Sequence, residues 1–173
     1  SGKSVSMRHL ANQLIERTIR SNDLKEKIPL YINLKELPST PNDQLTSDFI
    51  EKFVLDNIRR GDADTVDYVR EHWDEYREQG IWFFLFDSFD EIPAVMHAPS
   101  GSPLIRQYSE AIRQFSASMS SCRVIVASRE FKCPETLPWQ KFRILPLAPK
   151  RQEELIDNSF LKSEVRSPKS AIA

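Results

Sequence analysis

Six consecutive apolar residues, Ile81 to Phe86, are followed directly by the acidic stretch DSFDE, Asp87 to Glu91. Uninterrupted apolarity is typical of a strand that is buried on both faces, as in a parallel sheet covered by helices on each side. Six residues are far too few to cross a membrane, which takes about 20. The run therefore predicts a strand that is buried on both faces and ends in charged side chains.

Further strands and helices are expected to alternate around this run. Short apolar segments predict strands over Ile28–Leu34, Arg123–Ala127 and Phe142–Leu147. Apolar residues at helical spacing predict helices over the following segments: Ser4–Ile19, Asp48–Ile58 with Asp48 as its cap, Gly61–Gly80, Ser102–Phe115 and Pro149–Phe160. This alternation predicts an α/β fold with a mostly parallel sheet. We expect one domain over residues 1–162, and a frayed or truncated tail over residues 163–173.

Composition excludes several classes of protein. The chain has 24 Lys and Arg residues and 25 Asp and Glu residues, so its net charge is −1. It therefore lacks the net positive charge that attracts nucleic acid. We therefore expect no direct nucleic-acid binding, and also no membrane span. The two cysteines, Cys122 and Cys133, are too few for a disulfide framework. Without a recognisable secretory signal, they favour a reducing, cytoplasmic location.

The first candidate site is Gly2-Lys3-Ser4, which leads directly into the first predicted helix. These residues match the end of the phosphate loop G-x-x-x-x-G-K-[ST]. In that loop backbone N–H groups hold phosphates, the lysine reaches the outer phosphates, and the hydroxyl binds Mg²⁺. Taken alone, the tripeptide is equally consistent with an ordinary loop. Its position at a first helical turn favours phosphate binding.

The second candidate site is the acidic stretch itself. A carboxylate such as Asp87, at the end of a buried strand, is placed as a Walker B residue must be to meet Mg²⁺ at the edge of a sheet. Asp90 and Glu91 follow closely enough to polarise an attacking water. A solvated acidic turn is the alternative. However, three carboxylates within five residues repel one another unless a cation lies among them.

The third candidate site is Ser128-Arg129, directly after a predicted strand. A fixed guanidinium at that edge could contact a γ-phosphate or stabilise charge during phosphoryl transfer. A lone arginine after a strand is often only a surface residue. The order along the chain, from a lysine at a helix start to a carboxylate and then an arginine at strand ends, jointly indicates nucleotide handling.

In these three candidate sites and their order, the sequence resembles a NACHT domain, a branch of the STAND class of signalling P-loop NTPases. The most specific likeness is FLFDSFDEI (Phe84–Ile92), in which a small residue follows the metal-binding aspartate and an acidic pair comes after. VIVASRE (Val124–Glu130) resembles the family's sensor strand. IPLYINLKEL (Ile28–Leu37) and FRILPLAPKRQEELI, which begins at Phe142, resemble its second and last strands.

The resemblance implies a role for each matching residue. Gly2 and Lys3 would contact phosphate, and Ser128 would lie beside the nucleotide. Ser4 and Asp87 would ligate Mg²⁺. For catalysis, Asp90 and Glu91 would prepare the water, with the choice of base between them open, and Arg129 would sense the γ-phosphate.

The sequence also departs from the family pattern. The family's central strand, which precedes the phosphate loop, is not in the sequence, and neither is most of that loop. We therefore expect a three-layer P-loop NTPase sandwich that lacks its first, central strand, and we hypothesise a piece of a longer multidomain protein. A version extended at its N-terminus should then unfold more cooperatively than these 173 residues alone.

The function that the resemblance implies is a nucleotide switch. Binding of ATP or GTP with Mg²⁺, followed by slow hydrolysis, would control self-association of a signalling or defence protein related to innate immunity and antiviral defence. Sensor and effector domains would lie outside this chain. The alternatives are a non-hydrolysing nucleotide-binding or docking scaffold, and another P-loop ATPase such as a nucleotide kinase or an AAA-like motor.

Overall fold

The computed structural model describes residues 2–21, 26–40, 44–58, 63–119, 121–145, 148 and 151. The chain divides into two units, Ser1–Gln140 and Lys141–Ala173, and the fold described below is that of the first unit. Nearly all of the predicted final helix over Pro149–Phe160, and the whole predicted tail, lie outside the described residues.

Three parallel strands form the described sheet, in the order β1 (Ile28–Asn33), β2 (Trp82–Asp87) and β3 (Arg123–Val126). All six residues of β2 are buried, which confirms the strand predicted from the apolar run to be buried on both faces. Asn33 and Asp87 are paired at the carboxyl ends of β1 and β2. The loops that carry polar residues leave the sheet at this edge.

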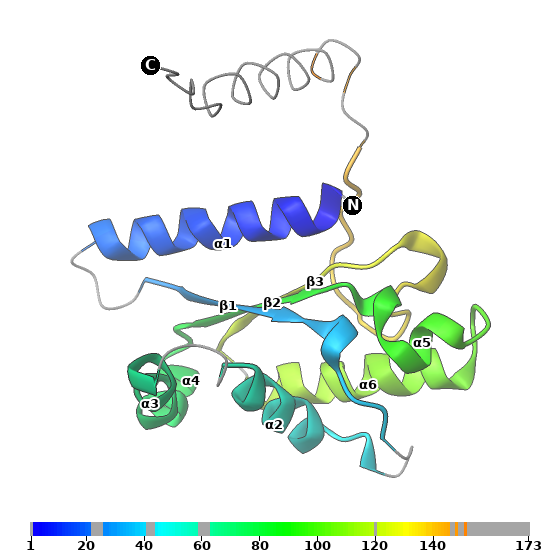
Figure 1. Ribbon diagram of the computed structural model, residues 1–173, viewed down its shortest axis with the longest axis horizontal. Helices are drawn as coiled ribbons and strands as arrows, with labels where there is room; N and C mark the ends of the chain where they lie inside the picture. Colours follow the sequence, from blue (N-terminus) through cyan, green and yellow to red (C-terminus); the bar gives the residue numbers. More distant parts are fainter. Residues whose placement is uncertain are drawn as a thin grey trace, which may run out of the picture. The chain divides into compact units, whose positions relative to one another are not determined.

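Helices cover both faces of the sheet, so that the described part of this unit has three layers (Figure 1). On one face lie α2 (Ser47–Ile58) and α6 (Pro103–Ser118), with the short helix α5 (Pro93–His97) nearby. Phe84 and Phe86 of β2 point to this side, where the ring of Phe115 packs edge-on against both. The predicted α/β class is confirmed, with six α-helices among the described residues.

The opposite face of the sheet is covered by α1 (Gly2–Arg20) (Figure 1). The buried residues of this second core come from α1, β2 and the position directly after β3: Met7, Ala11, Leu14, Phe83, Leu85 and Ala127. Near the C-terminus of α1, the Thr18 hydroxyl donates a 3.0 Å hydrogen bond to the Lys27 carbonyl, just before β1 begins. Helix α1 therefore runs antiparallel to β1, and its N-terminus lies toward the carboxyl edge of the sheet.

The segment between β1 and β2 differs in detail from the prediction. The Thr46 hydroxyl accepts a 3.3 Å hydrogen bond from the Phe49 N–H, so Thr46 rather than Asp48 caps α2. The helix predicted over Gly61–Gly80 is divided at His72 into α3 (Ala63–Glu71) and α4 (Trp73–Glu78). The backbone at His72 leaves helical geometry, with ψ of 7°.

Gly80 ends this helical segment, as predicted. Its φ of +66° is a left-handed conformation that glycine adopts without steric cost. The Ile81 N–H then donates a 2.8 Å hydrogen bond back to the Tyr76 carbonyl, which closes the turn into β2.

Two predicted core strands are not core strands in the described structure. β3 lies at one side of the sheet, and Ile125 is 36% exposed, because α1 packs mainly over β1 and β2. Of the strand predicted over Phe142–Leu147, residues 142–145, in the second unit, form no strand, and residues 146 and 147 lie outside the described residues.

In the part of the chain that the structure describes, every helix is too short or too polar to cross a membrane.

Candidate functional site

The site lies where β2 ends and the chain turns sharply. Ser88, directly after Asp87, has φ and ψ of 64° and 45°, a left-handed conformation that costs an L-residue roughly 1–2 kcal/mol. The next residue, Phe89, is held by a 3.0 Å hydrogen bond from its N–H to the Ala127 carbonyl at the end of β3. The strained turn therefore leaves Asp87 on the sheet and turns the following 3₁₀ segment, Phe89–Glu91, toward β3. A small residue suits this position.

Asp87 is buried with one of its oxygens unsatisfied. Its side chain is 2% exposed, and Oδ2 accepts a 2.6 Å hydrogen bond from the Tyr31 hydroxyl on β1. Oδ1 is buried and has no hydrogen-bond partner. Burial, together with the hydrogen bond to Asp87, raises the pKa of Tyr31, so its hydroxyl keeps the proton that it donates. Because a buried carboxylate oxygen is costly to leave unpaired, the site favours a cation at Oδ1.

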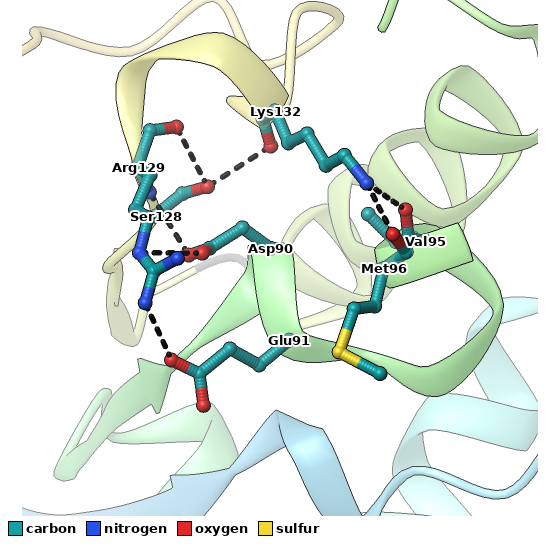
Figure 2. A network of polar contacts seen from close by, with 7 residues as sticks. All are labelled: Asp90, Glu91, Val95, Met96, Ser128, Arg129 and Lys132. Carbon is teal, nitrogen blue, oxygen red and sulfur yellow. Dashed lines mark hydrogen bonds and ion pairs between the residues drawn. The ribbon is translucent and has the colours of Figure 1, made fainter. Parts of the chain in front are cut away.

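Asp90, Glu91 and Arg129 are brought together from two loops (Figure 2). The Asp90 side chain is 4% exposed and holds Arg129 twice. Its Oδ1 accepts a 2.9 Å hydrogen bond from the Arg129 backbone N–H, and its Oδ2 lies 3.3 Å from the guanidinium Nε. Glu91 Oε1 lies 3.5 Å from an outer nitrogen of the same guanidinium, in a more exposed pair. Asp90 therefore anchors Arg129, while Glu91 contacts it loosely.

Ser128 and Lys132 close the loop that follows β3 (Figure 2). The Ser128 hydroxyl lies 2.9 Å and 3.1 Å from the carbonyl oxygens of Lys132 and Arg129, so it donates its hydrogen bond within this turn. The Lys132 ammonium donates to the carbonyls of Val95, at 3.0 Å, and Met96 in the last turn of α5. A cation is favoured at a helix C-terminus. Sequence analysis did not predict this contact, because Lys132 belongs to no motif.

Gly2, Lys3 and Ser4 form the first turn of α1. Ser4 lies three residues before the buried Met7, and so continues the stripe of α1 that faces the sheet. Arg8, one turn after Ser4, has its guanidinium carbon 5.7 Å from the centre of the Tyr31 ring. Since Tyr31 also bonds Asp87, the fold brings the start of α1 to the same edge of the sheet as the acidic stretch.

Asp87 and Ser4 carry oxygen donors of the kind that Mg²⁺ takes when it is shared with a phosphate ligand. Among the described residues, no three His, Cys, Asp or Glu side chains are arranged to hold a metal by themselves. Mg²⁺ does not require such a cage, because it is commonly bound through one or two carboxylates, water and substrate phosphates. The unpartnered oxygen of Asp87 and the hydroxyl of Ser4 are hard oxygen donors of the required kind.

Two surface hollows and the two cysteines lie outside the group of residues described above. Two hollows, of about 520 and 320 Å³, are lined by other residues. The first includes Asp56 and Arg70, and the second includes Arg106 and Glu110. Both cysteines are free thiols, and burial raises the pKa of Cys122, which is the opposite of what a thiolate nucleophile needs.

Comparison with known proteins found no relatives: no protein-family model, no curated protein and no solved structure matches the chain. The class that the structure establishes is an α/β protein, whose described residues form a parallel three-stranded sheet between helical layers. Any narrower assignment therefore depends on the residues at the carboxyl edge of that sheet.

Proposed function

We propose that this chain is the nucleotide-binding core of a NACHT-type signalling NTPase, which binds ATP or GTP with Mg²⁺ and hydrolyses it slowly. The observation that carries the proposal is the state of Asp87. This carboxylate is 2% exposed at the end of the central strand, and its Oδ1 has no hydrogen-bond partner. A solvated acidic turn, the alternative considered from sequence, would not bury its first carboxylate in this way.

Nucleotide binding would use residues from α1 and β2. The first turn of α1 exposes backbone N–H groups that suit an anion, and Lys3 adds a positive charge beside them. Ser4 and Asp87 would hold Mg²⁺ between them, Asp87 through the oxygen that Tyr31 leaves unpaired. The metal, when bound, neutralises charge that develops on the phosphate oxygens.

In hydrolysis, Asp90 and Glu91 would have different roles. Both oxygens of Asp90 are occupied by Arg129, so Asp90 is a positioning residue rather than the base. Glu91, with its side chain 36% exposed, makes one contact with Arg129 at 3.5 Å, and is better placed to accept a proton from water. Arg129 can turn its outer nitrogens toward an anionic phosphate while Nε stays with Asp90.

The role in the cell follows from the resemblance. Nucleotide state would control self-association of a cytoplasmic signalling or defence protein, as a population shift between two forms. Sensor and effector functions would belong to other domains. Slow turnover suits such a switch, since the bound state carries the signal.

Turnover in the full-length protein tests the proposal against a non-hydrolysing scaffold. Glu91→Gln should lower the hydrolysis rate about 100-fold or more while nucleotide affinity stays near the native value. Glu130→Gln, on an exposed residue of the loop after β3, is the control for loss of a carboxylate charge and should leave turnover unchanged. Native protein that binds nucleotide without releasing phosphate would support the scaffold instead.

A further inference from the structure

A second buried oxygen lies beside Asp87 and belongs to Asn33, the last residue of β1. Asn33 and Asp87 are paired positions on neighbouring parallel strands, so their side chains leave the same face of the sheet. Tyr31, two residues before Asn33, shares that face and confirms it by bonding Asp87. Asn33 Oδ1, like Asp87 Oδ1, is buried and has no hydrogen-bond partner.

The orientation of the Asn33 amide is determined by its neighbour Glu36. The Asn33 nitrogen donates a 3.2 Å hydrogen bond to Glu36 Oε1. An ionised carboxylate only accepts hydrogen bonds, so the nitrogen of Asn33 must face Glu36 and the oxygen must face away from it. The amide oxygen is thereby fixed as an acceptor beside Asp87. Two buried acceptors at paired strand positions, each without a hydrogen-bond partner in the described structure, indicate that a positively polarised group belongs there.

We propose that Asn33 supplies a second oxygen to the magnesium site, and binds the ion directly or through one of its water molecules. The inference rests on the proposed function, because it takes Asp87 as the metal-binding carboxylate. Amide oxygens are hard donors that suit Mg²⁺, and a water in the shell of Mg²⁺ donates strongly to such an acceptor. Glu36 acts behind Asn33 by holding the amide in the orientation that the metal requires.

The test is Mn²⁺ binding, followed by electron paramagnetic resonance, on the full-length protein with a non-hydrolysable ATP analogue. The same titration of the analogue without protein gives the baseline. Asn33→Ala should weaken Mn²⁺ binding about tenfold, the lower range for loss of a group that orients or supports a metal. Asn57→Ala is the control: it removes a half-buried asparagine from α2, on the other side of the sheet, and should leave Mn²⁺ binding unchanged.

A carboxylate at position 33 provides the second arm. Asn33→Asp should bind Mn²⁺ at least as tightly as the native protein, because a carboxylate is a stronger ligand. Without metal the new charge should lower the thermal midpoint by repelling Asp87, and added Mg²⁺ should raise that midpoint by more than in the native protein. If Asn33→Asp instead bound Mn²⁺ as weakly as Asn33→Ala, a ligand at position 33 would be contradicted.

The outcomes separate the two claims. If Asp87→Asn loses Mn²⁺ while Asn33→Ala binds it as tightly as the native protein does, the inference about Asn33 is overturned and the proposed function stands. If Asp87→Asn also binds Mn²⁺ normally, or the native protein binds no more Mn²⁺ than the analogue alone, both are overturned. A tenfold loss in Asn33→Ala with retention in Asn33→Asp supports the inference.

Discussion

Asp90 holds Arg129 by two separate contacts, one to its backbone and one to its side chain. Asp90 Oδ1 accepts a 2.9 Å hydrogen bond from the Arg129 N–H, and Oδ2 lies 3.3 Å from the guanidinium Nε. One buried carboxylate thus fixes both the path of the loop after β3 and the direction of its arginine. This relationship separates Asp90 from its neighbour Glu91, which sequence alone left as an equal candidate for the base.

The two carboxylates should respond differently to loss of charge. Asp90→Asn keeps an oxygen that accepts from the Arg129 N–H, but it places an amide nitrogen against Nε, so that two hydrogen-bond donors meet. It should therefore lower the free energy of unfolding by about 1–3 kcal/mol. Glu91→Gln changes only the half-exposed ion pair with Arg129, and should alter the free energy of unfolding by about 0.5 kcal/mol or less. Urea unfolding of both variants measures the contrast. Equal effects of the two substitutions would contradict the division of roles.

Gly80 should tolerate substitution less well than Gly101. Both glycines have positive φ, of 66° and 74°, so alanine costs roughly 1 kcal/mol at either position. A Cβ at Gly80 would also overlap the Ser121 carbonyl oxygen, whereas one at Gly101 meets nothing within 4 Å. Gly80→Ala should therefore destabilise the protein by about 2 kcal/mol or more. Denaturant midpoints for the two variants give the comparison, and similar losses would refute the overlap.

Ser88 should accept glycine but not valine. Its left-handed backbone, with φ of 64°, is unfavourable for a branched side chain and free of cost for glycine. Ser88→Val should lower stability by about 2 kcal/mol or more, while Ser88→Gly should stay within about 1 kcal/mol of the native protein. Thermal unfolding of the pair is sufficient, and a stable Ser88→Val protein would show that the turn relaxes.

Tyr76 should titrate at unusually high pH. Its hydroxyl lies 2.6 Å from the Tyr68 hydroxyl, and this hydrogen bond, followed by burial, raises the pKa of Tyr76 to about 12. Because the ordinary pKa is 10.0, the folded state binds more protons between the two values, and stability should fall as pH rises through that window. Tyr68→Phe should return the pKa of Tyr76 toward 10.0, as followed by tyrosinate absorbance. An unchanged titration would contradict the hydrogen bond as its main cause.

Local patterns predicted the parts of the fold that local physics determines. The apolar run ending at Asp87 is a strand with every residue buried, and Gly80 ends the helix before it. Long-range relations were not predictable in the same way. Whether Arg123–Ala127 is a core or an edge strand depends on which residues α1 covers, and a single apolar segment does not encode that.

The candidate site was predicted as residue types, but not as contacts. The sequence placed Asp90, Glu91 and Arg129 at the ends of two strands, and the fold brings them together. It did not reveal Tyr31 or Asn33, because a polar residue within an apolar strand carries no sign of the residue paired beside it. That pairing follows from sheet register, which is set by packing of whole strands.

Magnesium-dependent nucleotide binding tests the central claim most directly. Calorimetry on the full-length protein should show ATP or GTP binding that requires Mg²⁺, weakened at least about tenfold in both Lys3→Ala and Asp87→Ala. Lys52→Ala, on α2 at the other face of the sheet, is the control for loss of a lysine and should bind as the native protein does. Equal affinity in all four proteins, or no binding in any, would contradict a phosphate-loop site and leave an α/β fold with a different function.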